Sequence, residues 1–150
     1  MKRFVLFALG LLLCISCEQT EKDLDAKVLE HVAAFAEAYF NYDFEKARKM
    51  VTPDSEKWLR FAASNVTQED VDLLNAQEGV ATVEAEGYER LNDSTLAVTL
   101  TVRDFLTKDS LGAAGRIEAE GEFRIIAIRH DKSFLVRMEG LPRSERQSRD

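Results

Sequence analysis

The spacing of apolar residues changes once along this 150-residue chain, and that change limits the folds it can adopt. From Leu24 to about Asn75, apolar residues recur every three or four positions, as in helices with one buried face. From Val80 onward they alternate with polar residues, as in strands with one covered face. This order predicts an α+β fold, in which N-terminal helices pack on one face of a curved four-stranded antiparallel sheet.

The helical part is expected to consist of one long helix and three shorter ones. The break at 41–43 ends the first apolar stripe, and Asp43 is expected to cap the second helix. Thr52 and Pro53 are typical of the N-cap and first position of a third helix. Residues 67–70, Thr-Gln-Glu-Asp, resemble a capping box that opens the last one. The first stripe comprises Leu24, Val28, Val32, Phe35, Ala36, Tyr39 and Phe40.

The alternating part predicts four long strands that follow one another in a meander. Turns are expected at 92–94 and at 129–132, where polar residues interrupt the alternation. Gly87 and Gly121 lie inside predicted strands, where glycine commonly marks a bulge or a bend. The sheet is therefore expected to be curved. The predicted inward residues of the second strand are Leu96, Val98, Leu100 and Val102.

The first residues have the order of an export signal. Lys2 and Arg3 precede an apolar run over 4–15, which is too short to span a membrane. The end of the run, Leu-Cys-Ile-Ser-Cys over 13–17, resembles the bacterial lipobox, in which the last cysteine receives lipid before cleavage. The alternative acceptor, Cys14, follows a leucine that is too large for this cleavage site. An ordinary secretory signal with two incidental cysteines is the competing interpretation.

These features predict four regions. They are a lipoprotein signal peptide over 1–16, a lipidated tether over 17–23, an α+β domain over 24–142 and a disordered tail over 143–150. The net charge of −7 argues against a nucleic-acid partner and against electrostatic attraction to anionic lipid headgroups. Lipid on Cys17 is thus the expected membrane contact, and the expected location is the bacterial cell envelope, at the outer membrane.

Residues 35–47, Phe-Ala-Glu-Ala-Tyr-Phe-Asn-Tyr-Asp-Phe-Glu-Lys-Ala, carry a further resemblance. They are similar to the first helix, short break and second helix of many small exported lipoproteins in the cystatin-like, nuclear transport factor 2-like superfamily. The resemblance implies a sheet bent into a cone. It does not imply a single function, because this superfamily includes isomerases, hydratases, transport factors and interaction domains.

Enzymes of that superfamily work in the mouth of the cone, and the resemblance makes Tyr39, Tyr42, Asp43, Trp58 and Tyr88 candidate pocket residues. Asp104 continues the inward alternation of its strand, where an apolar setting would raise its pKa and suit it to proton abstraction. The alternative is a solvated Asp104 at the strand end. That alternative is favoured, because no histidine or second acid shares its register.

Simpler roles are available for most of these residues. Asp43 fits a helix cap, and Tyr39 and Trp58 fit the core at helical spacing. His31 and His130 are isolated, so no metal site is predicted, and no cofactor motif is present. The acidic series Glu118, Glu120 and Glu122 fits a solvated outer strand face.

The preferred hypothesis is a non-catalytic domain that binds a small ligand or a neighbouring envelope protein. The alternative is an isomerase-like or hydratase-like enzyme that uses Asp104 or Tyr39 in the cavity. A third hypothesis is a homodimer formed through the outer sheet face. The acidic series disfavours that contact, unless arginines answer it across strands. Those arginines are Arg90, Arg103 and Arg124.

Overall fold

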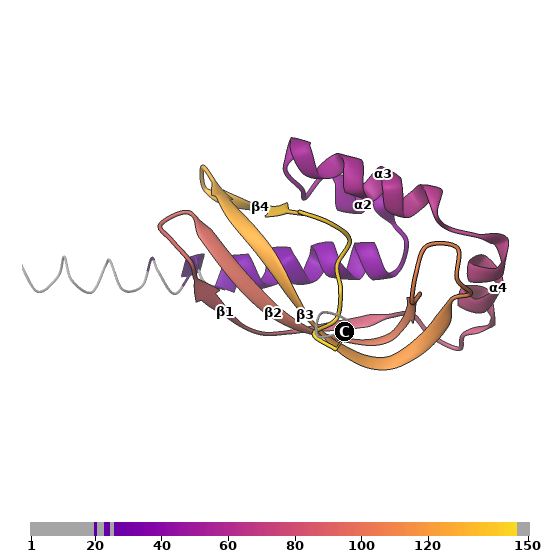
Figure 1. The fold of residues 1–150 in the computed structure, drawn as a ribbon. Coiled ribbons are helices and arrows are strands. Elements are labelled where there is room, and N and C mark those ends of the chain that lie inside the picture. The colour runs from indigo at the N-terminus through magenta and orange to yellow at the C-terminus, as the bar shows by residue number, and fades with distance from the viewer. Residues whose placement is uncertain (1–19, 21–22, 25, 147–150) are drawn as a thin grey trace, which may run out of the picture.

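The structure is a computed structural model that describes residues 20, 23–24 and 26–146 (Figure 1). The predicted signal peptide and Cys17 lie outside the described residues, as do most of the predicted tether and residues 147–150. In the part of the chain that is described, no helix is long and apolar enough to cross a membrane.

The helices come first along the chain. An N-terminal helix runs through residues 26–40 and is followed by α2 (Phe44–Arg48), the 3-10 helix η1 (Pro53–Ser55), α3 (Glu56–Ser64) and α4 (Gln68–Ala76). The predicted cap of α2 is confirmed, because the Asp43 carboxylate accepts a hydrogen bond from the Lys46 N–H at 3.0 Å. Thr67 and Asp70 form the predicted capping box of α4.

The strands form one antiparallel sheet in the order β1-β2-β3-β4. Their bounds are β1 (Thr82–Arg90), β2 (Thr95–Thr107), β3 (Arg116–His130) and β4 (Ser133–Arg137). The helices pack on one face of this sheet, as Figure 1 shows, so the predicted α+β fold class is confirmed. Val51, just before η1, forms a parallel bridge with Val136 of β4 and ties the helical layer to the sheet edge.

The two glycines within strands have different roles. The register between β1 and β2 shifts between Ala85 and Gly87, which confirms the expected bulge. No such shift occurs at Gly121. A methyl group at Gly121 would lie 2.9 Å from the Phe105 ring, so glycine allows that ring to approach the backbone.

The alternation of β2 breaks at Asp104. This residue has a φ of 54°, a left-handed conformation that is uncommon for residues other than glycine. Its side chain is exposed, while Phe105 and Leu106 are both buried. The structure therefore agrees with the favoured interpretation of a solvated Asp104, and the inward placement was wrong, because the left-handed backbone at this residue breaks the alternation and leaves its side chain exposed.

Backbone pairing extends beyond the predicted domain boundary at residue 142. Ser144 forms an antiparallel bridge with Phe123 of β3, and the Glu145 N–H donates to the Glu122 carbonyl at 2.9 Å. The predicted disordered tail over 143–150 consequently begins too early. The eight residues lack apolar side chains, but backbone hydrogen bonds to a sheet edge do not require them.

The core lies between the N-terminal helix and the sheet. At the end where the described helix begins, its side chains are aliphatic and fully buried, and they meet residues of β2, β3 and β4. We call this the closed end; it comprises Val28, Val32, Val98, Ala127 and Val136, each with no exposed surface. At the other end of the same helix the packing opens into a pocket.

Candidate ligand-binding pocket

A cavity of about 980 Å³ lies between the helices and the sheet. Its lining comes from the end of the N-terminal helix, from α3, from the connection between β2 and β3, and from residues 139–143 after β4. A volume of this size suits a small molecule. We call this region the aromatic pocket; its aromatic lining residues are Tyr39, Phe40, Tyr42, Phe44, Trp58, Phe61, Phe105 and Phe123.

The aromatic side chains form a connected wall. Tyr39 contacts Phe40 and Phe44 in edge-to-face arrangements, with ring centroids 5.2 and 5.8 Å apart. Phe40 in turn lies against Phe123, with centroids 4.7 Å apart. Such contacts hold rings in defined orientations, so the wall keeps its shape without a ligand. Two apolar side chains at the pocket remain open to solvent, since Phe61 is 37% exposed and Leu111 is 64% exposed.

The N-terminal helix ends in a way that directs Tyr42 toward the pocket. The Asp43 N–H donates to the Ala38 carbonyl at 2.9 Å and the Tyr42 N–H to the Tyr39 carbonyl at 3.1 Å. These bonds form a Schellman ending, in which the residue with positive φ is usually glycine. Here that residue is Tyr42, with a φ of 64°. Its side chain lines the pocket.

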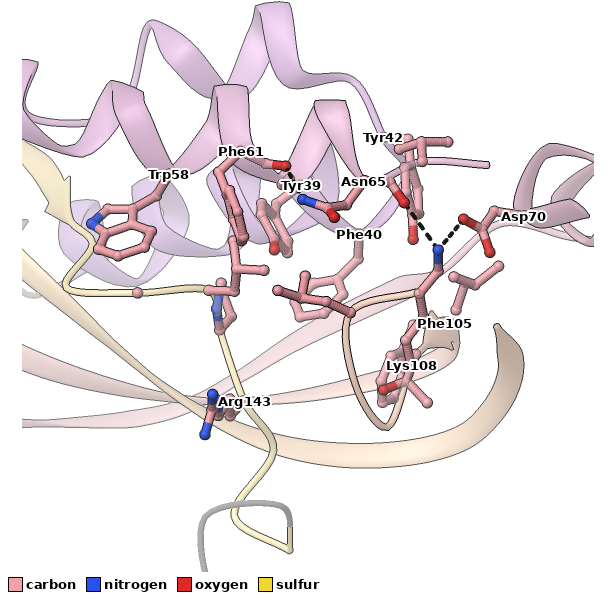
Figure 2. Close-up of a pocket in the computed structure, with 18 of the residues that line it drawn as sticks. Tyr39, Phe40, Tyr42, Trp58, Phe61, Asn65, Asp70, Phe105, Lys108 and Arg143 are labelled. Carbon is pink, nitrogen blue, oxygen red and sulfur yellow. Dashed lines mark hydrogen bonds and ion pairs between the residues drawn. The ribbon is translucent and has the colours of Figure 1, made fainter. Parts of the chain in front are cut away.

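One end of the pocket is polar. Lys108, which directly follows β2, forms an ion pair with Asp70 of α4 and donates to the Asn65 carbonyl at 3.0 Å (Figure 2). Asp70 is only 1% exposed. We call Tyr42, Asn65, Asp70 and Lys108 the polar end; Figure 2 shows Trp58 well away from it, on the other side of the pocket. The Asp70–Lys108 pair joins elements that are far apart in the sequence.

Burial opposes ionisation of Asp70, but its hydrogen bonds outweigh that cost. Lys108, the Thr67 backbone N–H and the Thr67 hydroxyl all favour the charged form of the carboxylate. Together they hold the pKa of Asp70 below its ordinary value. Its Oδ1 atom is buried without a hydrogen-bond partner among the described residues. A methyl group at Gly115 would lie 2.7 Å from this atom, so a side chain there would crowd the carboxylate.

Two tyrosines of the pocket keep their protons throughout the physiological pH range. Burial raises the pKa of Tyr39, and the nearby Tyr42 adds to the effect. Burial likewise raises the pKa of Tyr42 to about 12, with a further contribution from the negative charge of Asp70. Both hydroxyls can therefore act as hydrogen-bond donors toward a molecule in the pocket.

The structure brings together only some of the predicted site residues. Tyr39, Tyr42 and Trp58 line the aromatic pocket, whereas Asp43, Tyr88 and Asp104 are not among its lining residues. Asp43 is an exposed helix cap, and Tyr88 lies on β1 against the core. Asp104 is exposed and its carbonyl accepts from the Gln77 side chain at 2.7 Å.

Sequence reasoning missed the polar end apart from Tyr42. Asp70 was expected only as a capping-box residue, and nothing in the local sequence links it to Lys108, 38 positions later. One signal was present nearby, because the successive apolar residues Phe105 and Leu106 interrupt the alternation of the strand. Such an interruption indicates that the side chains after it occupy the other face of the sheet. It therefore marks where the residues that follow, Lys108 among them, turn toward the helical layer.

The carboxylates of the pocket lining already have partners. Asp70 is stabilised as a carboxylate that accepts hydrogen bonds, and Asp109 and Glu139 pair with Arg116 and Arg137. A carboxylate with a lowered pKa is a weak base. Among the described residues, no group of three side chains could hold a metal ion.

The outer face of the sheet carries cross-strand ion pairs. Arg103 binds Glu84 at 3.2 Å and Glu120 at 2.9 Å, and Arg124 binds Glu89 at 2.9 Å. Two of the three arginines named above therefore have acidic partners across strands, and one of those partners belongs to the acidic series. A face of paired charges is less repulsive toward a second copy than the sequence suggested. The homodimer stays a prediction.

Comparisons with known proteins give two distant structural likenesses and no family. No family model matches the chain, and no curated protein matches it. It is similar to the crystal structure of an NTF-2 like protein of unknown function from Shewanella oneidensis MR-1, with 11% identity and a TM-score of 0.48, over 74% of this chain and 92% of that one. It is also similar to an Ntf2 like protein involved in plasmid conjugation, with 16% identity and a TM-score of 0.42, over 81% of this chain and 48% of that one. Neither likeness carries a function to this chain.

Proposed function

We propose that this domain is a non-catalytic binding domain that holds a small, largely apolar molecule in the aromatic pocket. The observation that carries the proposal is the cavity of about 980 Å³, walled by aromatic side chains and closed at one end by polar ones. Apolar walls with a few convergent polar groups are typical of ligand sites. We further propose that the domain is exported and held on the cell envelope by lipid on Cys17.

Binding is favoured over catalysis because the carboxylates that line the pocket already have cationic partners, Lys108, Arg116 and Arg137. Asp104, the candidate for proton abstraction from the sequence, is outside the pocket lining. Tyr39 remains protonated, because burial raises its pKa. A non-catalytic site needs only shape, apolar surface and hydrogen-bond donors, and this pocket has all three.

The pocket hypothesis can be tested with N-phenyl-1-naphthylamine, a neutral dye whose fluorescence increases in apolar surroundings. The chain from residue 18 keeps every described helix and strand and suits this titration. Ala62 lines the pocket, so Ala62→Trp should fill part of it. We expect saturable binding to the unsubstituted chain and at least about a tenfold loss of affinity in Ala62→Trp, equivalent to about 1.4 kcal/mol.

Ala63→Trp is the matched control. Ala63 is the next residue of α3 and is exposed outside the pocket lining, so this variant should bind the dye as the unsubstituted chain does. Circular dichroism should show the same fold in all three proteins. Equal loss of affinity in both variants, or no saturable binding to any of them, would overturn the pocket hypothesis.

The anchor hypothesis has a separate test. Cells that express the full chain or Cys17→Ala are labelled with a radioactive fatty acid, and the protein is isolated from each. We expect label in the full chain and none in the variant, because Cys17 is the proposed acceptor. Equal labelling of both would show that the lipid is attached elsewhere, and absence of label from both would contradict a lipoprotein.

A further inference from the structure

Resting on this proposed function, we propose that the ligand is electrically neutral and carries a carbonyl or hydroxyl oxygen. The Tyr42 hydroxyl and the Lys108 ammonium would donate hydrogen bonds to that oxygen, while the aromatic wall would cover the apolar body. The polar end is thus a recognition site for one oxygen atom.

The first argument is the backbone position of Tyr42. A Schellman helix ending places glycine at this position at little cost, whereas a tyrosine there has unfavourable backbone strain. The Tyr42 ring packs edge-to-face on Phe44, with centroids 5.5 Å apart. Its hydroxyl has no hydrogen-bond partner among the described residues. Within the described part of the chain, the hydroxyl therefore has no hydrogen bond that would stabilise the fold. A ligand in the pocket would give it a hydrogen-bond partner.

The second argument is the set of donors that remain available. The Lys108 ammonium has three N–H groups, and its protein partners are the Asp70 carboxylate and the Asn65 carbonyl. One N–H is therefore free for a ligand. The Lys108 side chain is 18% exposed, although its partner Asp70 is buried. The Tyr42 hydroxyl lies at the same end of the pocket in Figure 2.

The third argument is charge. Asp70 already neutralises Lys108, so an anionic group would meet a pair with no net charge. Among the other lining residues, Asp109 and Glu139 are paired with Arg116 and Arg137, and Figure 2 shows Arg143 away from the polar end. An anion would therefore meet no net positive charge at the polar end, and a cation would meet the donors of Lys108 and Tyr42 rather than acceptors. A neutral oxygen satisfies the donors without either penalty.

Three dyes with the same dimethylaminonaphthalene body can test this proposal. One carries a propionyl ketone, one a propyl group without oxygen, and one a carboxylate. Each is titrated into the chain from residue 18, into Tyr42→Phe and into Tyr88→Phe. Tyr88→Phe is the same chemical change at a residue outside the pocket lining.

We expect the ketone dye to bind the unsubstituted chain most tightly of the three. In Tyr42→Phe its affinity should fall about fivefold, the size of one hydrogen bond of about 1 kcal/mol, while the propyl dye should bind as before. The ratio of ketone to propyl affinity should not change in Tyr88→Phe. Thermal unfolding of Tyr42→Phe should match the unsubstituted chain, because the hydroxyl bonds no described residue.

The outcomes separate this proposal from the one it rests on. If the propyl dye binds and Tyr42→Phe leaves the ketone-to-propyl ratio unchanged, the oxygen site is overturned and the pocket hypothesis stands. Tightest binding by the carboxylate dye would also overturn it, in favour of anion recognition. If none of the dyes binds, both proposals fail together.

Discussion

The two ends of the interface between the N-terminal helix and the sheet differ in the side chains that form them. At the closed end, aliphatic side chains are fully buried. At the aromatic pocket, Phe61 is partly exposed and an ion pair with one buried partner lies beside the rings. Of the three described non-glycine residues with positive φ, Tyr42 and Asp104 lie at this end or on a strand leading to it, and Asp131 lies in the turn after β3. Under the proposed function, the helix contributes stability over its first turns and ligand contacts over its last.

Strain and unpartnered polar groups are costly for folding, so their concentration in one place is informative. The closed end has none among its members. The pocket has a tyrosine in a glycine position and the orphaned Oδ1 of Asp70. This division predicts that substitutions at the closed end reduce stability, whereas those at the pocket mainly change binding.

The largest expected effect comes from a matched pair of phenylalanines. Phe35 is fully buried between the two ends, whereas Phe61 lines the pocket and is 37% exposed. Phe35→Ala should lower the free energy of unfolding by about 3 to 5 kcal/mol, and Phe61→Ala by about 1 kcal/mol or less. Urea denaturation measures both. Similar losses would show that the pocket side is packed as a second core.

An intermediate effect is expected for Asp70→Asn, which leaves the Lys108 charge without its partner. We expect a loss of about 2 to 3 kcal/mol, less than for a fully buried pair because Lys108 is partly exposed. The pKa of Asp70 is lowered by folding, so its contribution is present above its ordinary value near 3.8 and is lost as the pH falls through the folded value.

The same pair therefore predicts a difference in acid sensitivity. Between pH 7 and pH 3, the unsubstituted chain should lose more stability than Asp70→Asn, so that the two unfolding curves converge at low pH. Denaturation at several pH values checks this. Parallel curves would mean that the carboxylate does not contribute through its charge.

The smallest effect is expected for Tyr39→Phe. The Tyr39 hydroxyl has no hydrogen-bond partner among the described residues, so its removal should change stability by less than about 0.5 kcal/mol. The ring contacts with Phe40 and Phe44 are kept. Thermal unfolding measures the change. A loss above 1 kcal/mol would indicate that this side of the pocket also supports the fold.

Local signals in the sequence predicted most of the fold. The apolar stripe of the first helix, the Asp43 cap and the Thr67 capping box each depend on residues within four positions of one another. Strand alternation and the bulge at Gly87 are likewise signals that depend on neighbouring residues of one strand. Such patterns report the direction of side chains along one element, and the order of elements then limits how they pack.

The site was less predictable because it depends on contacts between distant residues. Tyr39, Tyr42 and Trp58 were named from a resemblance, but Asp70 and Lys108 are separated by the rest of α4 and two strands. For Asp104, strand alternation alone pointed inward, whereas the favoured interpretation of a solvated side chain agrees with its exposure; its positive φ was not visible in the pattern. The predicted domain ended too early, at residue 142, because residues 144 and 145 pair with β3 through backbone groups alone. Such pairing leaves no side-chain pattern in the sequence.

The length of the N-terminal helix affects the route by which a ligand would reach the pocket. Its described residues 26–40 extend about 20 Å, and the pocket lies at the far end from where the chain enters the domain. If Cys17 is lipidated as proposed, the pocket lies at the end of this helix away from the anchored end of the domain. We would then expect a ligand to enter the pocket from the aqueous side rather than directly from the bilayer.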